Sequence, residues 1–354
     1  MEKNTIIQRL QKESCFVLYR FPKSKTIHGI IDHSLKRIKT IQELQNIPSA
    51  FIFAPFNIEE LPICVFSPTE TFEFEQSDDT IVLPQSDSYH SQPSDSYRTE
   101  FNIFHQKISD GHFSKLVLAR SKTLNLEMDS FDLFMDACCA YPDTMVYLLH
   151  TPDTGTWIGA SPEILLEGNC IQMHTIALAG TMTCSESTPK LSEWSGKNKE
   201  EQKIVTDYIR DCIRVVGELK DEWGPYSYKT AHLAHLRSDL YFRLDSDKIP
   251  EMITILHPTP AICGIPKKDA LQCILNTETK SRSYYSGFFG WYEPSGNTQL
   301  YVNLRCLQQN DNSNFTLYAG GGILASSTLE SEWSETENKM LTLLQLPSLK
   351  NKLK

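Results

Sequence analysis

The sequence YAGGGI, residues 318–323, is followed closely by SEWSETENK, residues 331–339. The second segment predicts a helix, and a rotation of about 100° per residue places Glu332, Glu335 and Lys339 on one narrow arc of it. The apolar side chains of the same helix fall on the opposite side and can anchor it to a core. The charged arc has two interpretations: a solvated carboxylate–ammonium pair on the surface, or one wall of a functional site.

The composition is that of a globular protein with a sizeable core. The chain has 354 residues, 40% of them hydrophobic, and a net charge of −10. This length suits one large domain or two ordinary ones, and the acidic balance argues against a nucleic-acid partner. No apolar run approaches the ~18 residues of a membrane span, and the N-terminus leads into no signal-peptide region. The ten cysteines are scattered without a Cys-x-x-Cys pair, so we expect reduced thiols and a cytoplasmic location.

The pattern of predicted elements changes near residue 95. Residues 1–75 alternate short apolar runs with polar turns and predict strands, whereas residues 76–97 are rich in Ser, Asp, Gln and Pro and predict a loop. Helices and strands then alternate without a β-α-β rhythm, and the clearest helix is predicted over 197–216. This order favours an α+β protein with large, mainly antiparallel sheets over a Rossmann fold or a TIM barrel.

The predicted elements share short apolar runs bounded by turn residues. Strands are predicted at 15–19, 50–53, 63–66, 115–120, 145–149, 156–160, 164–167, 171–178, 236–242, 287–292, 299–307 and 315–319. Further helices are predicted over about 98–108 and 131–139.

Three charged residues stand in apolar surroundings. Glu201 lies on the core-facing stripe of the 197–216 helix, so it is either paired, hydrogen-bonded or metal-bound, or exposed to water in a frayed first turn. Glu163 follows Pro162, which ends strand pairing and presents the carboxylate at a turn. Lys115 begins an apolar strand, where it is either an edge lysine or, if buried, a candidate general base.

Ten segments, in the same order along the chain, make the sequence similar to the chorismate-utilising enzymes, and most closely to the isochorismate synthases of the menaquinone and siderophore type. The resemblance covers roughly residues 96–345. The segments are SKLVLAR (114–120), GASPE (159–163), ALAGT (177–181), KNKEEQKIV (197–205), HL (235–236), HPTPAICGIPK (257–267), RSYYSG (282–287), VNLR (302–305), AGGGI (319–323) and EWSETENK (332–339).

The resemblance implies a fold like that of anthranilate synthase component I. Two large, mainly antiparallel sheets would pack face to face, with helices on both outer sides. Residues 1–95 would form the N-terminal, strand-rich part of the same domain, and residues 96–354 the chorismate-binding catalytic region.

The resemblance also implies a reaction, the Mg²⁺-dependent and reversible conversion of chorismate into isochorismate. Water attacks ring carbon C2 and the C4 hydroxyl leaves. Lys115 would deprotonate the water and Glu163 would protonate the departing hydroxyl. Glu201 and Glu335 would bind the magnesium ion, with Glu332 close by.

The substrate contacts implied by the resemblance come from several segments. Arg305 and Tyr285 would hold the enolpyruvyl carboxylate, His235 would line the ring pocket, and Lys339 would face a carboxylate. Further contacts, several of them through backbone donors, would come from Leu178, Gly180, Thr181, Gly320 and Gly322.

The sequence departs from the family pattern in two places. Many relatives continue Arg-Pro-Arg-Gly after ALAGT, whereas this chain has MTCS at 182–185. Gln202 stands where relatives often carry histidine, so a role for that histidine cannot be transferred.

Several functions remain as alternatives. The nearest is a salicylate synthase, which continues the same chemistry by eliminating pyruvate. Ala179 replaces the nucleophilic lysine of the aminodeoxychorismate branch. Anthranilate synthases typically carry Pro-Ile-Ala-Gly-Thr-Arg-Pro-Arg-Gly, which Ala177, Leu178 and Met182 do not match, so we expect no amidotransferase subunit. A hydrolase using Glu163 and Glu201 would leave Lys115 and Arg305 unexplained, and a non-catalytic binding protein would not need to retain the acid, the base and the metal ligands. We expect a monomer that binds chorismate and neither nucleic acid nor membrane.

Overall fold

The computed structural model describes residues 3–76, 81, 83, 91–169, 171–184, 187–230, 232–311 and 313–353. Within them the chain forms two nine-stranded sheets. Every pairing between neighbouring strands for which a register is defined is antiparallel. The prediction of an α+β fold with two large antiparallel sheets is therefore confirmed.

The first sheet combines strands from the whole length of the chain. In spatial order its strands are β14 (Gly264–Ile265), β7 (Lys115–Asn125), β18 (Asn314–Ile323), β17 (Cys306–Gln309), β9 (Gly155–Ser161), β8 (Met145–Thr151), β1 (Phe16–Arg20), β2 (Thr26–Ile31) and β6 (Glu70–Glu75).

The second sheet is built in the same way. Its strands, in spatial order, are β12 (Glu218–Thr230), β13 (Leu233–Arg243), β11 (Met173–Thr183), β10 (Ile164–Gly168), β16 (Thr298–Val302), β15 (Phe288–Tyr292), β4 (Ala50–Ala54), β5 (Ile63–Phe66) and β3 (Lys36–Ile38). The N-terminal strands β1 to β6 are thus divided between the two sheets, and in each sheet one of them pairs with a strand from later in the chain.

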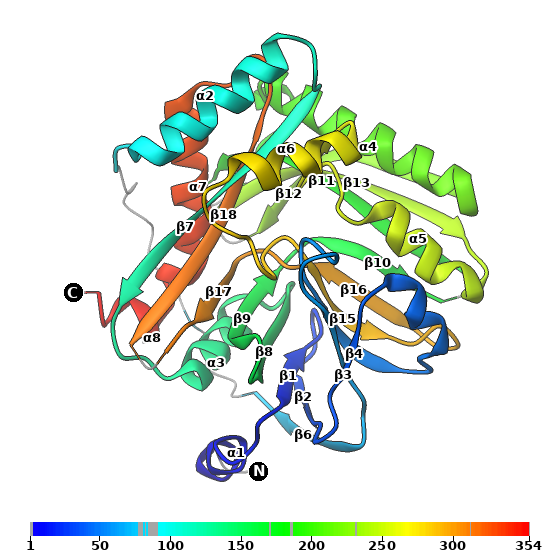
Figure 1. Cartoon of the computed structure of the whole chain (residues 1–354), viewed down its shortest axis with the longest axis vertical. Helices are drawn as coiled ribbons and strands as arrows, with labels where there is room; N and C mark the ends of the chain where they lie inside the picture. The colour runs from blue at the N-terminus through cyan, green and yellow to red at the C-terminus, as the bar shows by residue number, and fades with distance from the viewer. Residues whose placement is uncertain are drawn as a thin grey trace.

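Helices cover the two outer faces. The first sheet carries α2 (Asp95–Ser109), α3 (Ser130–Ala140), α6 (Lys267–Thr277) and α7 (Leu329–Leu344), and the second carries α4 (Gly196–Val216) and α5 (Ile249–Leu256). Figure 1 shows α4 and α5 on one side of the molecule and α2 and α7 beside β7 and β18 on the other. The remaining helices are α1 (Lys3–Leu10), α8 (Pro347–Lys350) and the 3-10 turns η1 (Ile41–Asn46), η2 (Leu191–Glu193) and η3 (Ser246–Lys248). None of the helices among the described residues is long and apolar enough to cross a membrane.

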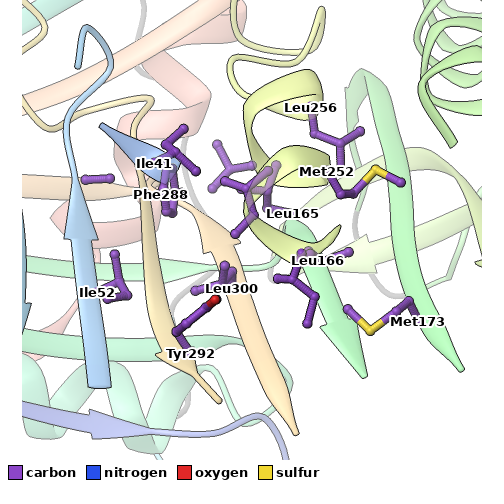
Figure 2. Packing of buried hydrophobic residues seen from close by; sticks show 14 of the residues in the cluster. Ile41, Ile52, Leu165, Leu166, Met173, Met252, Leu256, Phe288, Tyr292 and Leu300 are labelled. Atoms are coloured by element: carbon purple, nitrogen blue, oxygen red, sulfur yellow. The ribbon is translucent and has the colours of Figure 1, made fainter. Parts of the chain in front are cut away.

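Aromatic side chains fill the space between the sheets. The rings of Phe53 and Tyr284 stack with their centroids 4.5 Å apart, and those of Tyr147 and Phe289 lie 4.3 Å apart. Outside the second sheet, Met252 and Leu256 of α5 lie near Leu165, Leu166 and Leu300 of the strands, as Figure 2 shows. Burying each such side chain contributes roughly 1.5–3 kcal/mol, so these layers fix the positions of the strand ends. The cysteines that the structure describes are free thiols and most are buried.

One predicted strand is two strands in the structure. Residues 299–307 divide into β16, which belongs to the second sheet, and β17, which belongs to the first. The chain crosses between the sheets at 303–305, where Arg305 has φ 50° and the amide oxygen of Asn303 accepts a hydrogen bond from Tyr147 Oη at 2.8 Å. A second boundary is also wrong: β11 begins at Met173 because Ile171 is 81% exposed.

Candidate active site

Lys115 lies at the start of β7 and is fully buried. It is not at the sheet edge, because Ile265 of β14 pairs with it on the outer side, and β18 pairs with β7 on the inner side. Its ammonium group lies 2.8 Å from the Oε1 atom of Glu201. Of the two interpretations of this lysine, the buried one is therefore correct.

Glu201 lies in the second turn of α4, where it is 5% exposed. The helix begins after Ser195, whose hydroxyl accepts a hydrogen bond from the backbone N–H of Asn198, so the first turn is capped. Burial alone would raise the pKa of Glu201, but the cations Lys115 and Lys197 outweigh it, and the pKa is lowered. The side chain is a buried carboxylate in an ion pair, and the frayed-turn interpretation is wrong.

Glycine at position 322 leaves room for this ion pair. A Cβ atom on Gly322 would lie 2.1 Å from Glu201 Oε1 and 2.8 Å from Lys115 Cε. A Cβ atom on Gly320 would lie 3.0 Å from the hydroxyl of Tyr285. The glycine run therefore lets β18 approach functional side chains more closely than a residue with a side chain could.

Glu163 follows β9 and is 4% exposed. Its backbone is held where the two sheets meet, because Val302 N–H donates to the carbonyl oxygen of Glu163 at 2.9 Å. Burial raises the pKa of the Glu163 carboxyl to about 7, although the nearby cations Lys115, Lys339 and Arg305 oppose the shift. A protonated carboxyl group is thus available near neutral pH.

Arg305 and His235 form a second polar pair. Burial lowers the pKa of Arg305 to about 10, so the guanidinium stays charged at neutral pH. Burial, followed by the Arg305 charge, lowers the pKa of His235 well below its usual value. The neutral imidazole can accept a hydrogen bond at Nε2 from Arg305 Nη2, 3.2 Å away. Nδ1 then carries the proton and can donate to the carbonyl oxygen of Gly180 at 3.3 Å.

Most of the predicted site residues line one cavity. Glu163 and Glu201 line it, and so does every residue predicted to bind substrate: Leu178, Gly180, Thr181, His235, Tyr285, Arg305, Gly320, Gly322 and Lys339. The segments come from both sheets and from α4 and α7, so the cavity lies where the two layers meet. Lys115, Glu332 and Glu335 are not among the residues that line this cavity, and the roles of all the predicted residues remain predictions.

The sequence did not indicate several apolar wall residues, namely Val117, Ala261, Ile262, Leu304 and Tyr318. The ring of Tyr318 stacks on that of Tyr285, with centroids 5.4 Å apart and an interplanar angle of 13°. The period of two along β18 was an available signal, because Tyr318 shares a strand face with Gly320 and Gly322.

Each predicted metal ligand is paired with a lysine. Lys197 pairs with Glu332, which is fully buried, and Lys339 pairs with Glu335 at 2.7 Å, while Glu201 has Lys115. Burial and the neighbouring Glu335 raise the pKa of Glu332 to about 7, although Lys197 opposes the shift. The pair that the sequence predicted on one arc of α7, Glu335 with Lys339, is therefore present, but it is mostly buried rather than solvated.

The donor set nevertheless fits a magnesium ion. A Cβ atom on Gly321 would lie 3.0 Å from Glu332 Oε2 and 3.9 Å from Glu335 Oε1, so oxygens of both glutamates lie beside this glycine. Burial alone would lower the pKa of Lys197, but the charges of Glu332, Glu335 and Glu201 together raise it. In the part of the chain that is described, no three His, Cys, Asp or Glu side chains are arranged to hold a metal ion as they stand. Oxygen ligands suit Mg²⁺, and the ammonium group of Lys197 is paired with one of these carboxylates, Glu332.

Known proteins are similar to this chain in both sequence and fold. The family model described as chorismate binding enzyme matches residues 66–346. The isochorismate synthase DhbC of Bacillus subtilis is 30% identical over 278 residues, which are 73% of this chain and 70% of that protein.

Two solved structures share the fold. The menaquinone-specific isochorismate synthase MenF from Escherichia coli has a TM-score of 0.78 at 18% identity and covers 95% of this chain and 90% of its own. Anthranilate synthase component I from Streptococcus pneumoniae has a TM-score of 0.67 at 16% identity and covers 97% of both chains. The fold predicted from the resemblance is confirmed. Since the family match spans most of the chain and includes the cavity-lining segments, the chain belongs to the chorismate binding enzymes.

Proposed function

We propose that the protein is an isochorismate synthase, which converts chorismate reversibly into isochorismate. The observation that carries the proposal is that one buried cavity contains a carboxyl group with a pKa of about 7, Glu163, and lies beside the buried Lys115–Glu201 pair. An exchange of a hydroxyl group between two ring carbons needs one group that accepts a proton and one that donates a proton. The name of the B. subtilis relative supports the same reaction.

The cavity would orient chorismate through its carboxylates. Arg305 offers a planar guanidinium group to one carboxylate. Its contacts with His235 and with the carbonyl oxygen of Lys339 (3.3 Å) fix the orientation of the guanidinium group. Gly180 and Thr181 would present backbone groups to the substrate. The apolar wall formed by Val117, Ile262 and Leu304 excludes water from the ring, which strengthens these charged contacts.

The proposed reaction needs two proton transfers. In its neutral form, in which it is no longer paired with Glu201, Lys115 would accept the proton of the attacking water at Nζ, and Glu163 would protonate the departing C4 hydroxyl. Glu201, Glu332 and Glu335 would hold magnesium, and the bound ion would neutralise a substrate carboxylate and withdraw charge from the ring.

The product distinguishes this proposal from its nearest rival. We expect chorismate and isochorismate to approach the same mixture from either side, because Leu178, Ala179 and Thr181 offer no additional acid, base or nucleophile for pyruvate elimination. Chromatography of the reaction, together with a lactate-dehydrogenase assay for pyruvate, measures both outcomes. Stoichiometric pyruvate with fluorescent salicylate would instead identify a salicylate synthase. No turnover of chorismate at all would contradict both proposals.

Magnesium dependence gives a second test. EDTA should lower turnover and added Mg²⁺ should restore it. When Mg²⁺ is added, Glu201, Glu332 and Glu335 would bind the ion in place of their lysine partners. Lys197→Met should lower the melting temperature of the metal-free protein and enlarge the increase that Mg²⁺ produces, since Lys197 and the ion compete for the same carboxylates. The matched control is Lys203→Met on the exposed face of the same helix, whose partner Asp207 lies outside the site. Full activity after metal removal would exclude a magnesium requirement.

The wider role follows from the same proposal. We infer a cytoplasmic enzyme that acts as a monomer without an amidotransferase subunit and supplies isochorismate to menaquinone synthesis. Ala179 supports the absence of amino transfer, because it offers no nucleophile. Size-exclusion chromatography with light scattering would show whether the active species is a monomer.

A further inference from the structure

We propose that Gln202 is a positioning residue that sets the conformation of the substrate-binding backbone at Ala179–Thr181. The residue follows Glu201 on α4 and is 1% exposed. Its side chain does not enter the cavity. Instead it reaches the second sheet at the place where β11 becomes irregular. The proposal rests on the proposed function only for its kinetic readout.

Every polar atom of the Gln202 side chain has a partner in the structure. Its Oε1 accepts a hydrogen bond from the backbone N–H of Ala179 at 2.9 Å. Its Nε2 donates to the carbonyl oxygen of Ala177 at 3.0 Å and approaches the hydroxyls of Ser238 at 3.2 Å and Thr206 at 3.3 Å. The amide therefore bonds two backbone groups of β11 at once.

Strand β11 is bulged directly after the residues that Gln202 bonds. Ala179 is opposite Leu236 and Thr181 is opposite His235, so the register shifts by one residue at Gly180. Gly180 has φ 73°, and a Cβ atom there would lie 3.0 Å from the Cβ of Asn198. A bulge disrupts the local ladder of hydrogen bonds. A buried N–H without a partner destabilises a fold, and the Gln202 oxygen satisfies the N–H of Ala179.

The placement of Gln202 couples two parts of the cavity. One turn of α4 directs Glu201 to Lys115 and Gln202 to Ala179, so the backbone that contacts substrate is fixed relative to the buried ion pair. A glutamine can do this because it carries an acceptor and a donor on one planar group. Losing the bonds should loosen Gly180 and Thr181 without removing any group that touches substrate.

The test compares Gln202→Met with Thr206→Val. Methionine keeps the volume and removes all the hydrogen bonds. The control removes a buried hydroxyl of the same helix that contacts Ser238, the Gln202 carbonyl and Gln202 Nε2, but it leaves both bonds from Gln202 to β11 in place. For Gln202→Met we expect the chorismate KM to rise about tenfold or more, which corresponds to about 1.4 kcal/mol, with a smaller change in kcat. Amide hydrogen exchange in residues 177–181 should become faster. In Thr206→Val both quantities should stay near those of the wild type.

A KM and an exchange rate that match the control in Gln202→Met would overturn the proposal. If Gln202→Met does not fold, Gln202→Glu replaces it, since glutamate keeps the acceptor for Ala179 N–H but places an oxygen against the Ala177 carbonyl. Faster exchange at 177–181 is then expected in that variant, and unchanged exchange contradicts the proposal. Hydrogen exchange needs no substrate, so it tests Gln202 even if the wild type fails to convert chorismate.

Discussion

Replacing Glu163 with glutamine is expected to lower kcat by about 10²–10⁴-fold, the usual contribution of a positioned proton donor. Glutamine has nearly the same shape, so the cavity should still bind chorismate with an affinity close to that of the wild type. The wild-type rate should also decline as the pH rises above about 7, because the carboxyl group with a pKa of about 7 then loses the proton that it must donate. The measurement is kcat against pH for both proteins, and the residual activity of the variant should lack this decline.

Glu100→Gln provides the matched control for Glu163. Glu100 is also a buried carboxylate, but it lies in α2 and accepts hydrogen bonds from the backbone and hydroxyl of Thr279. Its replacement should change stability and leave the pH profile of kcat in place. A Glu163→Gln enzyme with near-normal kcat would remove this residue from the role of the acid.

Replacing Lys115 with methionine should affect both rate and stability. We expect kcat to fall by about 10²–10⁴-fold because the proton acceptor is lost. The free energy of unfolding should fall by about 3–5 kcal/mol, since removing one member of a buried ion pair deprives the other charge of its direct partner. That remaining charge is Glu201, which is 2.8 Å from the lysine in the native protein. Chemical denaturation and steady-state kinetics measure the two effects.

A double variant separates the two effects of losing Lys115. Lys115→Met combined with Glu201→Gln removes both charges, so stability should return toward that of the wild type, while kcat should remain low. Glu201→Gln alone leaves the lysine buried without its partner and should also destabilise the protein. Recovery of activity in the double variant would contradict the proposed roles of both Lys115 as proton acceptor and Glu201 as metal ligand.

The sequence predicted those parts of the fold in which burial is periodic. The stripe of Val205, Ile209 and Ile213 identified α4, and the apolar run after Lys115 identified β7. It predicted neither β12, whose residues are exposed along most of the strand, nor α6, which buries only Ala270, Cys273 and Ile274. An element with few buried residues has little apolar pattern to detect.

The candidate site was only partly predictable from the sequence. The motifs identified the residues that line the cavity, but they could not indicate which charge lies next to which. Lys197 and Glu332 are 135 residues apart in sequence, and their pairing depends on the way α4 and α7 meet above the glycines of β18. The direction of the Glu163 pKa shift likewise depends on complete burial, which a strand end in the sequence does not guarantee.

The left-handed backbone at Arg305 has a consequence for attempts to make this protein more heat-resistant. A residue with a side chain at φ 50° bears a conformational cost of roughly 1–2 kcal/mol that glycine would avoid. Selection for melting temperature alone should therefore favour Arg305→Gly, and would thereby delete the guanidinium group from the cavity. At this position the most thermostable library members should be the inactive ones, so a library that varies residue 305 must be screened for turnover as well as for heat resistance.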